Sequence, residues 1–224
     1  MSNNSIPVLG ILFLALAIII ILVLYKGYKN VSASLFFQKN IAKNLVAMFD
    51  QLELPRSLLP VLDSDELELL ANNCVVPSVG FKMQDSVCNY ICNIYQEKMI
   101  LSVKKDVGLG KKLWLFAGNQ RQFAFVETKD KSYRVFSQKD GEIGVLDGGN
   151  TFIQASKVSS KINFNQTEGN QTIELQGKEI AGLSKIANRD SKVPVRHFIY
   201  IDAANVLDND AFWVVLYASL MDVV

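Results

Sequence analysis

The residue types that carry out acid–base, nucleophilic or metal chemistry are sparse in this chain of 224 residues. Its one histidine, His197, would have to serve any mechanism of the Ser-His-Asp or Cys-His kind. His197 alternates with Val195 and Ile199 in an extended apolar run, which places all three on one face of a strand. We therefore interpret His197 as a structural residue rather than a catalytic one.

The three cysteines give a second chemical candidate, because Cys74, Cys88, Cys92 and His197 are all residue types that bind zinc. Their spacing matches no zinc finger or ribbon. An odd and sparse set of cysteines also fits a reducing compartment better than a disulfide-stapled domain. We expect ordinary thiols, with no metal and no cofactor.

Two further motifs have structural explanations. Residues 108–112, Gly-Leu-Gly-Lys-Lys, lack the spacing and the Ser or Thr of a phosphate-binding loop. Asp208-Asn209-Asp210 lacks the glycine and the distal glutamate of a calcium loop, and it suits the start of a helix instead. The 23 basic residues nearly cancel the 22 acidic ones, so nothing in the charge favours nucleic acid. The sequence predicts a protein that is not an enzyme.

The strongest signal is an uncharged apolar run at residues 6–25, preceded by a short tail of residues 1–5. About 20 residues at about 1.5 Å each match a hydrocarbon core of about 30 Å, so we predict a transmembrane helix. A cleaved signal peptide would need a basic start and a small-residue cleavage site, and neither is present. The expected anchor residues are Ile6, Leu9, Leu12, Phe13, Leu16, Ile19, Ile20, Leu22, Leu24 and Tyr25.

The flanks of this run predict its orientation. Lysines follow the run and none precedes it, which places the carboxyl-terminal side in the cytoplasm by the positive-inside rule. Lys26, Tyr28 and Lys29 are expected at the membrane interface. Four Asn-x-Ser/Thr tripeptides, beginning at residues 3, 30, 165 and 170, favour the opposite side because they match the glycosylation pattern.

Residues 26–97 are predicted to be a helical juxtamembrane segment. Apolar residues recur at helical spacing between residues 34 and 73, and Pro55 and Pro60 are expected to break the pattern. A weaker helix is predicted from Gln84 to Gln96. The apolar stripe suits either a membrane surface or the soluble domain, and we favour packing against the domain.

Residues 98–224 are predicted to be an antiparallel β domain that ends in a buried helix. Short aromatic or β-branched runs alternate with turns such as Asp140-Gly141, which is typical of a meander in a barrel or sandwich. The strands are expected at 112–116, 122–126, 132–136, 142–146, 151–155, 161–164, 171–175 and 193–201. The fold class is therefore mainly β with helices.

The last helix, residues 211–224, is apolar around nearly its whole circumference. At about 14 residues it is too short for a comfortable membrane span, so we expect it to lie inside the protein. Its buried residues are predicted to be Phe212, Trp213, Leu216, Tyr217 and Leu220.

Three segments carry a family resemblance: the strand–glycine turn–strand at 171–185, the strand at 198–202, and the terminal helix with its late Asp222. Residues 139–145 look like another such hairpin. Together they resemble the tubby carboxyl-terminal-like superfamily, which includes phospholipid scramblases and LURP-one-related plant proteins. The resemblance implies a β-barrel wrapped around the terminal helix, and a membrane-associated or lipid-binding role.

These observations predict a single-pass, non-enzymatic membrane protein whose β domain binds a partner protein or a lipid headgroup. The alternative is a structural subunit of a membrane assembly, such as envelope or secretion machinery, with an α+β domain outside the cytoplasm. A third hypothesis is a lipid-handling enzyme or transporter, which would need oligomers or the barrel interior because one span forms no pathway. The expected partners are membrane lipid and other membrane proteins.

Overall fold

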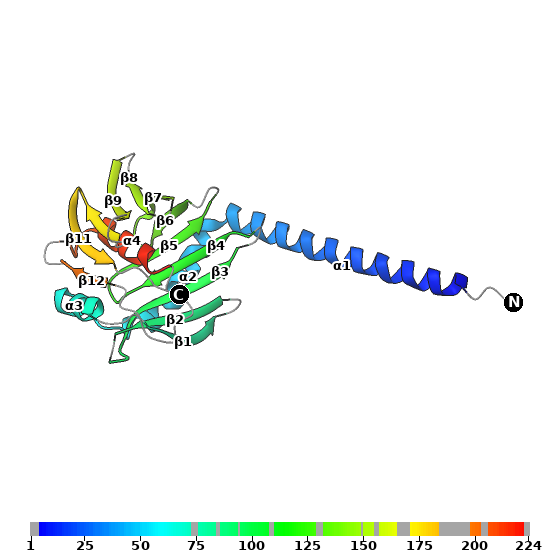
Figure 1. Ribbon diagram of the computed structural model, residues 1–224, viewed down its shortest axis with the longest axis horizontal. Helices are drawn as coiled ribbons and strands as arrows, with labels where there is room; N and C mark the ends of the chain where they lie inside the picture. Colours follow the sequence, from blue (N-terminus) through cyan, green and yellow to red (C-terminus); the bar gives the residue numbers. More distant parts are fainter. Residues whose placement is uncertain are drawn as a thin grey trace.

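A long helix projects from a rounded β domain in the computed structural model (Figure 1). The structure describes residues 5–72, 76–83, 86–93, 95–107, 110–128, 132–148, 150–154, 157–164, 171–183, 198–202 and 206–221. The projecting helix is α1, Ser5–Lys39, and it is followed by α2, Ile41–Ser57, and α3, Ser64–Asn72. The helices expected before residue 73 are thus confirmed as helices.

Pro55 does not end α2, contrary to the prediction. Proline removes one backbone hydrogen bond, and here the loss falls in the last turn, where few helical bonds follow. The helix ends at Ser57, before Pro60. The proline pattern therefore predicted the end of this helix a few residues too early.

The side chains of α1 are described without interruption from residue 12 to residue 28. Over the part of the chain that the structure describes, no helix combines the length and the apolarity that crossing a bilayer demands. The membrane crossing of residues 6–25 stays a prediction.

Twelve antiparallel strands form one sheet, ordered as they occur in the chain. The predicted meander is confirmed, but the predicted barrel or sandwich is not. Within the described ranges the strands form one open sheet, in which no pairing joins the first and last strands. The strands are β1 Val76–Met83, β2 Ser86–Cys92, β3 Lys98–Asp106, β4 Lys112–Ala117, β5 Gln122–Glu127, β6 Tyr133–Ser137, β7 Gly141–Asp147, β8 Thr151–Gln154, β9 Lys157–Phe164, β10 Gln171–Leu175, β11 Lys178–Leu183 and β12 Phe198–Ile201.

The predicted helix from Gln84 to Gln96 is wrong, because β2 occupies most of it and pairs with β1 and β3. Cys88 and Cys92 are four residues apart, a spacing that puts two residues on one face of a helix and also on one face of a strand. The observed burial alternates, with Cys88 on one side of the sheet and Ile91 on the other. The β domain therefore begins before residue 98. The last part of the strand predicted at 193–201 is observed as β12. His197 lies outside the described residues.

The sheet has a core on each side, and among the described residues the outer one covers only the strands β2 to β6. The inner core holds Phe123 and Phe125 of β5 together with α4, Asp210–Ser219. The outer core holds Ala124 and Val126 of the same strand together with the buried face of α2. Because alternate residues of a strand point to opposite faces, one strand serves both cores. The apolar stripe of α2 thus packs on the domain, as we favoured.

The carboxyl-terminal helix α4 is buried as predicted. The five residues expected to be inside, Phe212, Trp213, Leu216, Tyr217 and Leu220, are each at most 1% exposed. Asn209 caps the helix, since its side-chain oxygen accepts a hydrogen bond from the Ala211 N–H at 2.9 Å. The helix packs against β8, β9 and β10 inside the curved sheet (Figure 1).

The helix α3 covers one open edge of the sheet. It packs against β12. Its Leu67 and Leu70 are buried in the inner core, which also holds Ile91 of β2 and Met99 of β3. An uncovered strand edge invites pairing with other chains, and a helix laid along it removes that hazard.

Gly144 in β7 is a position where even one methyl group does not fit. A β-carbon there would collide with the Ile153 carbonyl oxygen and lie 2.8 Å from the Phe152 ring. We expect Gly144→Ala to lower the free energy of unfolding by about 1–3 kcal/mol, as overpacking of a core does. Urea unfolding of the detergent-solubilised chain measures the change. Gly27→Ala is the control, because nothing lies within 4 Å of that position. Equal stability of the two variants would contradict the packing described.

Candidate binding cleft

The turn between β4 and β5, residues 118–121, connects the two helices that lie on opposite faces of the sheet. On the α2 side, Arg56 donates a hydrogen bond to the Asn119 carbonyl oxygen, and the Asn119 side chain donates to the Leu59 carbonyl oxygen at 2.7 Å. On the α4 side, Arg121 forms an ion pair with Asp210. These contacts fix the turn in place between the two cores.

A cleft of about 370 Å³ opens beside this turn. It is formed by the β4–β5 turn with the start of β5, by the β6–β7 turn, and by the residues around the start of α4. Its lining is predominantly polar and consists of Gln120, Arg121, Gln122, Phe123, Ser137, Gln138, Lys139, Asp140, Asp208 and Asp210. A cleft with several converging polar groups is a reasonable place for ligand recognition.

The charges of the lining favour a cationic ligand over an anionic one. Three carboxylates face two basic side chains. Arg121 is bound to Asp210, and Asp208 lies 3.9 Å from the same guanidinium. The Asp208 side chain is fully exposed. Because the charge of Arg121 is already neutralised by the start of α4, an anion would have to displace Asp210.

Gln122, at the start of β5, has a buried side-chain oxygen without a hydrogen bond among the described residues. Its Nε2 donates to Oε1 of Gln138 at 2.8 Å and to Oε2 of Glu53 at 3.3 Å. The Glu53 carboxylate only accepts hydrogen bonds, so this arrangement fixes which side of the amide is nitrogen. Gln122 is 4% exposed, and its Oε1 has no donor among the described residues. A buried acceptor left unpaired costs about 1–3 kcal/mol.

Tyr217 lies beneath the same turn and contributes packing rather than chemistry. Burial raises the pKa of its phenol well above the usual range, while the Gly118 backbone, Arg121 and Arg56 oppose this rise more weakly. Its ring packs on Phe116 with centroids 5.6 Å apart. The phenol therefore stays neutral and acts as part of the inner core.

Of the four chemical candidates from the sequence, the structure describes Cys88 and Cys92. Cys88 is buried, and burial raises the pKa of its thiol to about 11, which makes a reactive thiolate unfavourable. Cys92 is buried as well, while Cys74 and His197 lie outside the described residues. Among the residues described, no group of three or more His, Cys, Asp or Glu side chains is arranged to hold a metal ion.

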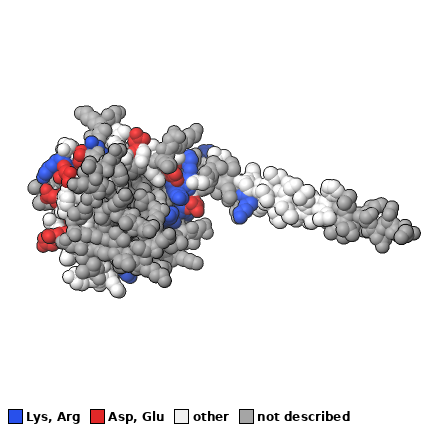
Figure 2. All heavy atoms as spheres, in the orientation of Figure 1, with Lys and Arg blue, Asp and Glu red and all other residues white. Residues whose placement is uncertain are grey.

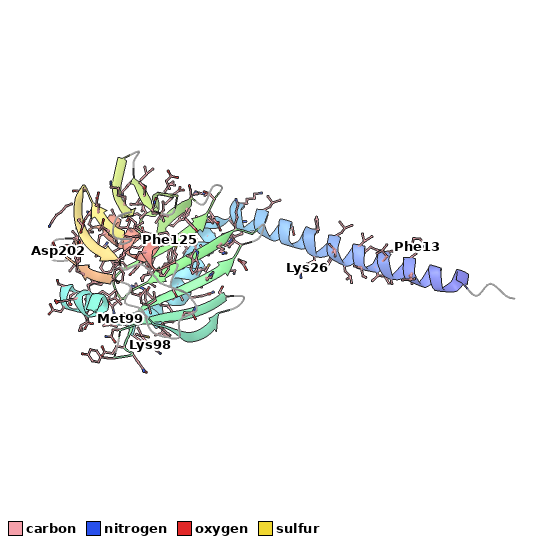
Figure 3. All side chains as sticks on the ribbon, in the orientation of Figure 1. Phe13, Lys26, Lys98, Met99, Phe125 and Asp202 are labelled. Atoms are coloured by element: carbon pink, nitrogen blue, oxygen red, sulfur yellow. The ribbon has the colours of Figure 1, made fainter. Side chains whose placement is uncertain are left out.

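The expected anchor residues whose side chains are described are all exposed on α1. Figure 3 shows their side chains projecting into open space around the helix, with Phe13 and Lys26 labelled. Those described are Leu12, Phe13, Leu16, Ile19, Ile20, Leu22, Leu24 and Tyr25, and they are 49–66% exposed. Lys26 and Tyr28 are exposed too, whereas the side chains of Ile6, Leu9 and Lys29 lie outside the described part.

Glu66, in the first turn of α3, has a carboxyl group with a raised pKa, which makes the stability of the fold depend on pH. Burial raises its pKa above the ordinary value of 4.5, and the carboxylates of Glu97, Asp63 and Asp65 raise it further. Its Oε2 is buried without a hydrogen-bond partner among the described residues. The carboxyl group is therefore held in a place that suits its protonated form.

We expect Glu66→Gln to stabilise the fold at neutral pH. Because the folded pKa is raised, the wild type is favoured below the unfolded pKa and loses stability as the pH rises through the folded pKa. The advantage of the glutamine variant should thus be largest at pH 7 and disappear at about pH 3, below the unfolded pKa. Thermal unfolding at both pH values checks this. Glu68→Gln, an exposed position on the same helix, is the control. A pH-independent difference would contradict the role given to Glu66.

Comparison of the chain with models of protein families, with curated proteins and with solved structures finds no match. No sequence motif marks the cleft, because Gln122, Asp140 and Asp208 lie in separate segments of the chain. The one local signal is Asp208-Asn209-Asp210, which contributes both aspartates to the lining while Asn209 caps α4.

Proposed function

We propose that this chain is a membrane-tethered, non-enzymatic binding module. In this proposal α1 holds the protein in a bilayer through residues 6–25, and the β domain presents its surface to a partner protein. The single observation that carries the proposal is the exposed apolar surface of α1. From Leu12 to Tyr25 it has no charged residue, and it projects away from the domain. Apolar surface of this extent is costly in water and is typical of a lipid or protein contact.

The rest of α1 would act as a stalk. Residues 26–39 continue the helix beyond the apolar run, and 14 residues at 1.5 Å each give about 21 Å. This length would keep the domain clear of the lipid headgroups. The domain would then meet partners in the aqueous phase rather than lie on the membrane.

The filled interior of the domain favours surface recognition over lipid transport. Trp213 and Tyr217 of α4 pack with Phe116 and Phe123 in the centre of the inner core. A carrier for lipid would need that space.

The sheet curved around α4 also supports the similarity to the tubby-like fold, in which a terminal helix is enclosed.

The lysines that follow the apolar run support a cytoplasmic domain. Lys26, Lys39 and Lys43 are exposed, and Figure 2 shows basic side chains gathered where the domain meets α1. Positive charge on this side of a span favours retention in the cytoplasm. Maleimide should thus label the chain, after denaturation to expose Cys88 and Cys92, only in permeabilised cells. Labelling of intact cells would show instead that the domain lies outside the cytoplasm.

Alkaline extraction of membranes from cells that express the full chain tests the anchor. We expect the protein to stay in the membrane pellet with integral proteins, because the apolar surface of α1 is stable only out of water. Release into the supernatant together with peripheral proteins would overturn the proposal. A soluble protein expressed in the same cells is the control for protein that is merely trapped in vesicles.

A second candidate is a structural subunit of a membrane assembly, and apolar residues on and after α2 favour it. Val46, Leu54, Leu58 and Val61 are 46–81% exposed on or just after this helix. Such residues suit packing against a neighbouring subunit. Native mass after gentle detergent extraction distinguishes the candidates, since a strictly monomeric particle would count against an assembly.

A further inference from the structure

We infer that the exposed apolar residues at the carboxyl end of α2 form a docking surface for a basic amphipathic helix of the partner protein. This inference rests on the proposed binding function and names the chemistry that the partner must present. The surface, called the distal patch below, consists of Leu54, Leu58 and Val61, which are 74%, 81% and 46% exposed. Two observations lead to the inference: the helical spacing of these residues and the acidic residues around them.

The apolar side chains of the distal patch have the spacing of a helix-packing stripe. Leu54 and Leu58 are one helical turn apart, so they lie on one face of α2, and Val61 follows three residues later. The same segment turns Leu59 and Leu62 inward, where they are 5% and 3% exposed in the two cores. The fold therefore has its own apolar contacts here, and the distal patch is left for another molecule.

The distal patch is held on the side of the domain away from α1. Arg56 donates to the Asn119 carbonyl oxygen and to Glu53, and the Asn119 side chain donates to the Leu59 carbonyl oxygen at 2.7 Å. These bonds fix the end of α2 on the β4–β5 turn. Because β3 and β4 are antiparallel, this turn lies at the end of the sheet where β3 starts. Figure 3 shows Lys98, the first residue of β3, on the side of the domain opposite α1. A partner in the aqueous phase can thus reach the patch.

Acidic residues surround the distal patch. Asp50 lies one helical turn before Leu54, Asp63 lies two residues after Val61, and both aspartates are exposed. Residues 50–68 contain one basic residue, Arg56, and it is already paired with Glu53 at 2.8 Å. The same segment contains six acidic residues, in a chain whose net charge is +1: Asp50, Glu53, Asp63, Asp65, Glu66 and Glu68. The apolar stripe therefore has negative charge at both of its ends.

This combination selects one class of partner. A helix with apolar residues at the same spacing would bury the stripe, and lysine or arginine on its flanks would meet the carboxylates. Contact of the patch with its counterpart on a second copy would bring the same acidic residues together without basic ones. An acidic helix or an anionic lipid surface would meet the same repulsion.

Fluorescence anisotropy on the full chain in nanodiscs of zwitterionic lipid tests the inference, with empty nanodiscs as the blank for peptide bound to lipid. The probe is a fluorescein-labelled peptide of about 14 leucine and lysine residues, whose leucines recur at i, i+3, i+4 and i+7. One counterpart carries glutamate in place of lysine, and the other has the same residues reordered so that no apolar face forms. We expect saturable binding of the probe, with affinity at least about tenfold weaker for both counterparts. Equal binding of either counterpart, or no binding of the probe beyond the blank, would overturn the inference.

Replacing both Leu54 and Leu58 with serine locates the binding site. We expect the probe to bind this variant at least about tenfold more weakly, while the fold is kept because both side chains are exposed. The matched control replaces Leu35 and Val46 with serine, two other helical positions that are 59% and 55% exposed. The control should bind the probe like the wild type. Unchanged binding in the Leu54 and Leu58 variant would overturn the inference.

Asp50→Lys tests the charge of the partner separately. We expect this change to weaken the lysine probe several-fold and to bring the glutamate counterpart closer to it in affinity. Unchanged affinity for both peptides would contradict the selection by charge. Because the protein is already held in a nanodisc, these results are separate from the extraction test of the anchor. A chain that stays in the membrane pellet but does not bind the probe would overturn this inference and leave the anchor in place.

Discussion

Trp213→Ala is expected to lower the free energy of unfolding of the β domain by about 3–5 kcal/mol, the loss typical of truncating a buried aromatic residue. Trp213 is 1% exposed, and its ring packs edge to face on Phe212 with centroids 5.2 Å apart. Its indole N–H also donates to the Leu207 carbonyl oxygen at 2.7 Å. Removing the ring leaves a cavity and takes away the donor that this carbonyl uses.

Denaturant unfolding of the full chain in mild detergent measures this loss, and Trp114 remains in the variant as a fluorescent reporter. Leu58→Ala is the matched control, because Leu58 is 81% exposed and its truncation should change stability by no more than about 0.5 kcal/mol. A loss below about 1 kcal/mol in Trp213→Ala would mean that α4 does not fill the interior of the domain.

Replacing both Ile19 and Ile20 with lysine is expected to release the chain from membranes. Each lysine near the centre of a span disfavours insertion by about 2.5–3.5 kcal/mol, so the pair disfavours it by about 5–7 kcal/mol. Both positions lie in the exposed apolar run of α1, where Ile19 is 57% and Ile20 is 49% exposed. The folded β domain makes no use of them, so its stability should not change.

The control for this pair makes the same chemical change elsewhere. Val46→Lys and Leu54→Lys also place two lysines on exposed apolar positions of a helix, but on α2. We expect that variant to stay in the membrane fraction. Alkaline extraction of both variants decides the matter. If the α1 pair stayed in the membrane as firmly as the α2 pair, the anchor would have to lie elsewhere.

Local signals were sufficient to predict most of the meander. The strands β4 to β10 are short runs rich in aromatic and β-branched residues and bounded by turn residues, which predicts strands. The turn at Asp140-Gly141 is confirmed, with Gly141 at a φ of +71°. The burial of α4 also followed from its sequence, since an apolar helix too short for a membrane has few other places. These features depend on neighbours along the chain.

Features that depend on contacts between residues far apart in the sequence could not be predicted from local patterns. In β2 the even spacing of Cys88 and Cys92 fits both a helix and a strand, and only pairing with β3 selects the strand. For α2 the sequence favoured packing on the domain but did not indicate its partners, since Leu45 and Phe49 share the outer core with Leu115 and Ala124 of distant strands. The cleft requires three separate turns to meet, which no single segment of the sequence reveals.

Nitroxide scanning of α1 in lipid vesicles tests the central claim most directly. Labels at positions 19 and 35, in a variant whose three cysteines are replaced by alanine, report the local environment through collisions with oxygen and with a water-soluble nickel complex. These positions are 16 residues apart, or about 24 Å along a helix. At position 19 we expect high oxygen and low nickel accessibility, and at position 35 the reverse. Equal access of the nickel complex to both positions would contradict a membrane-embedded α1.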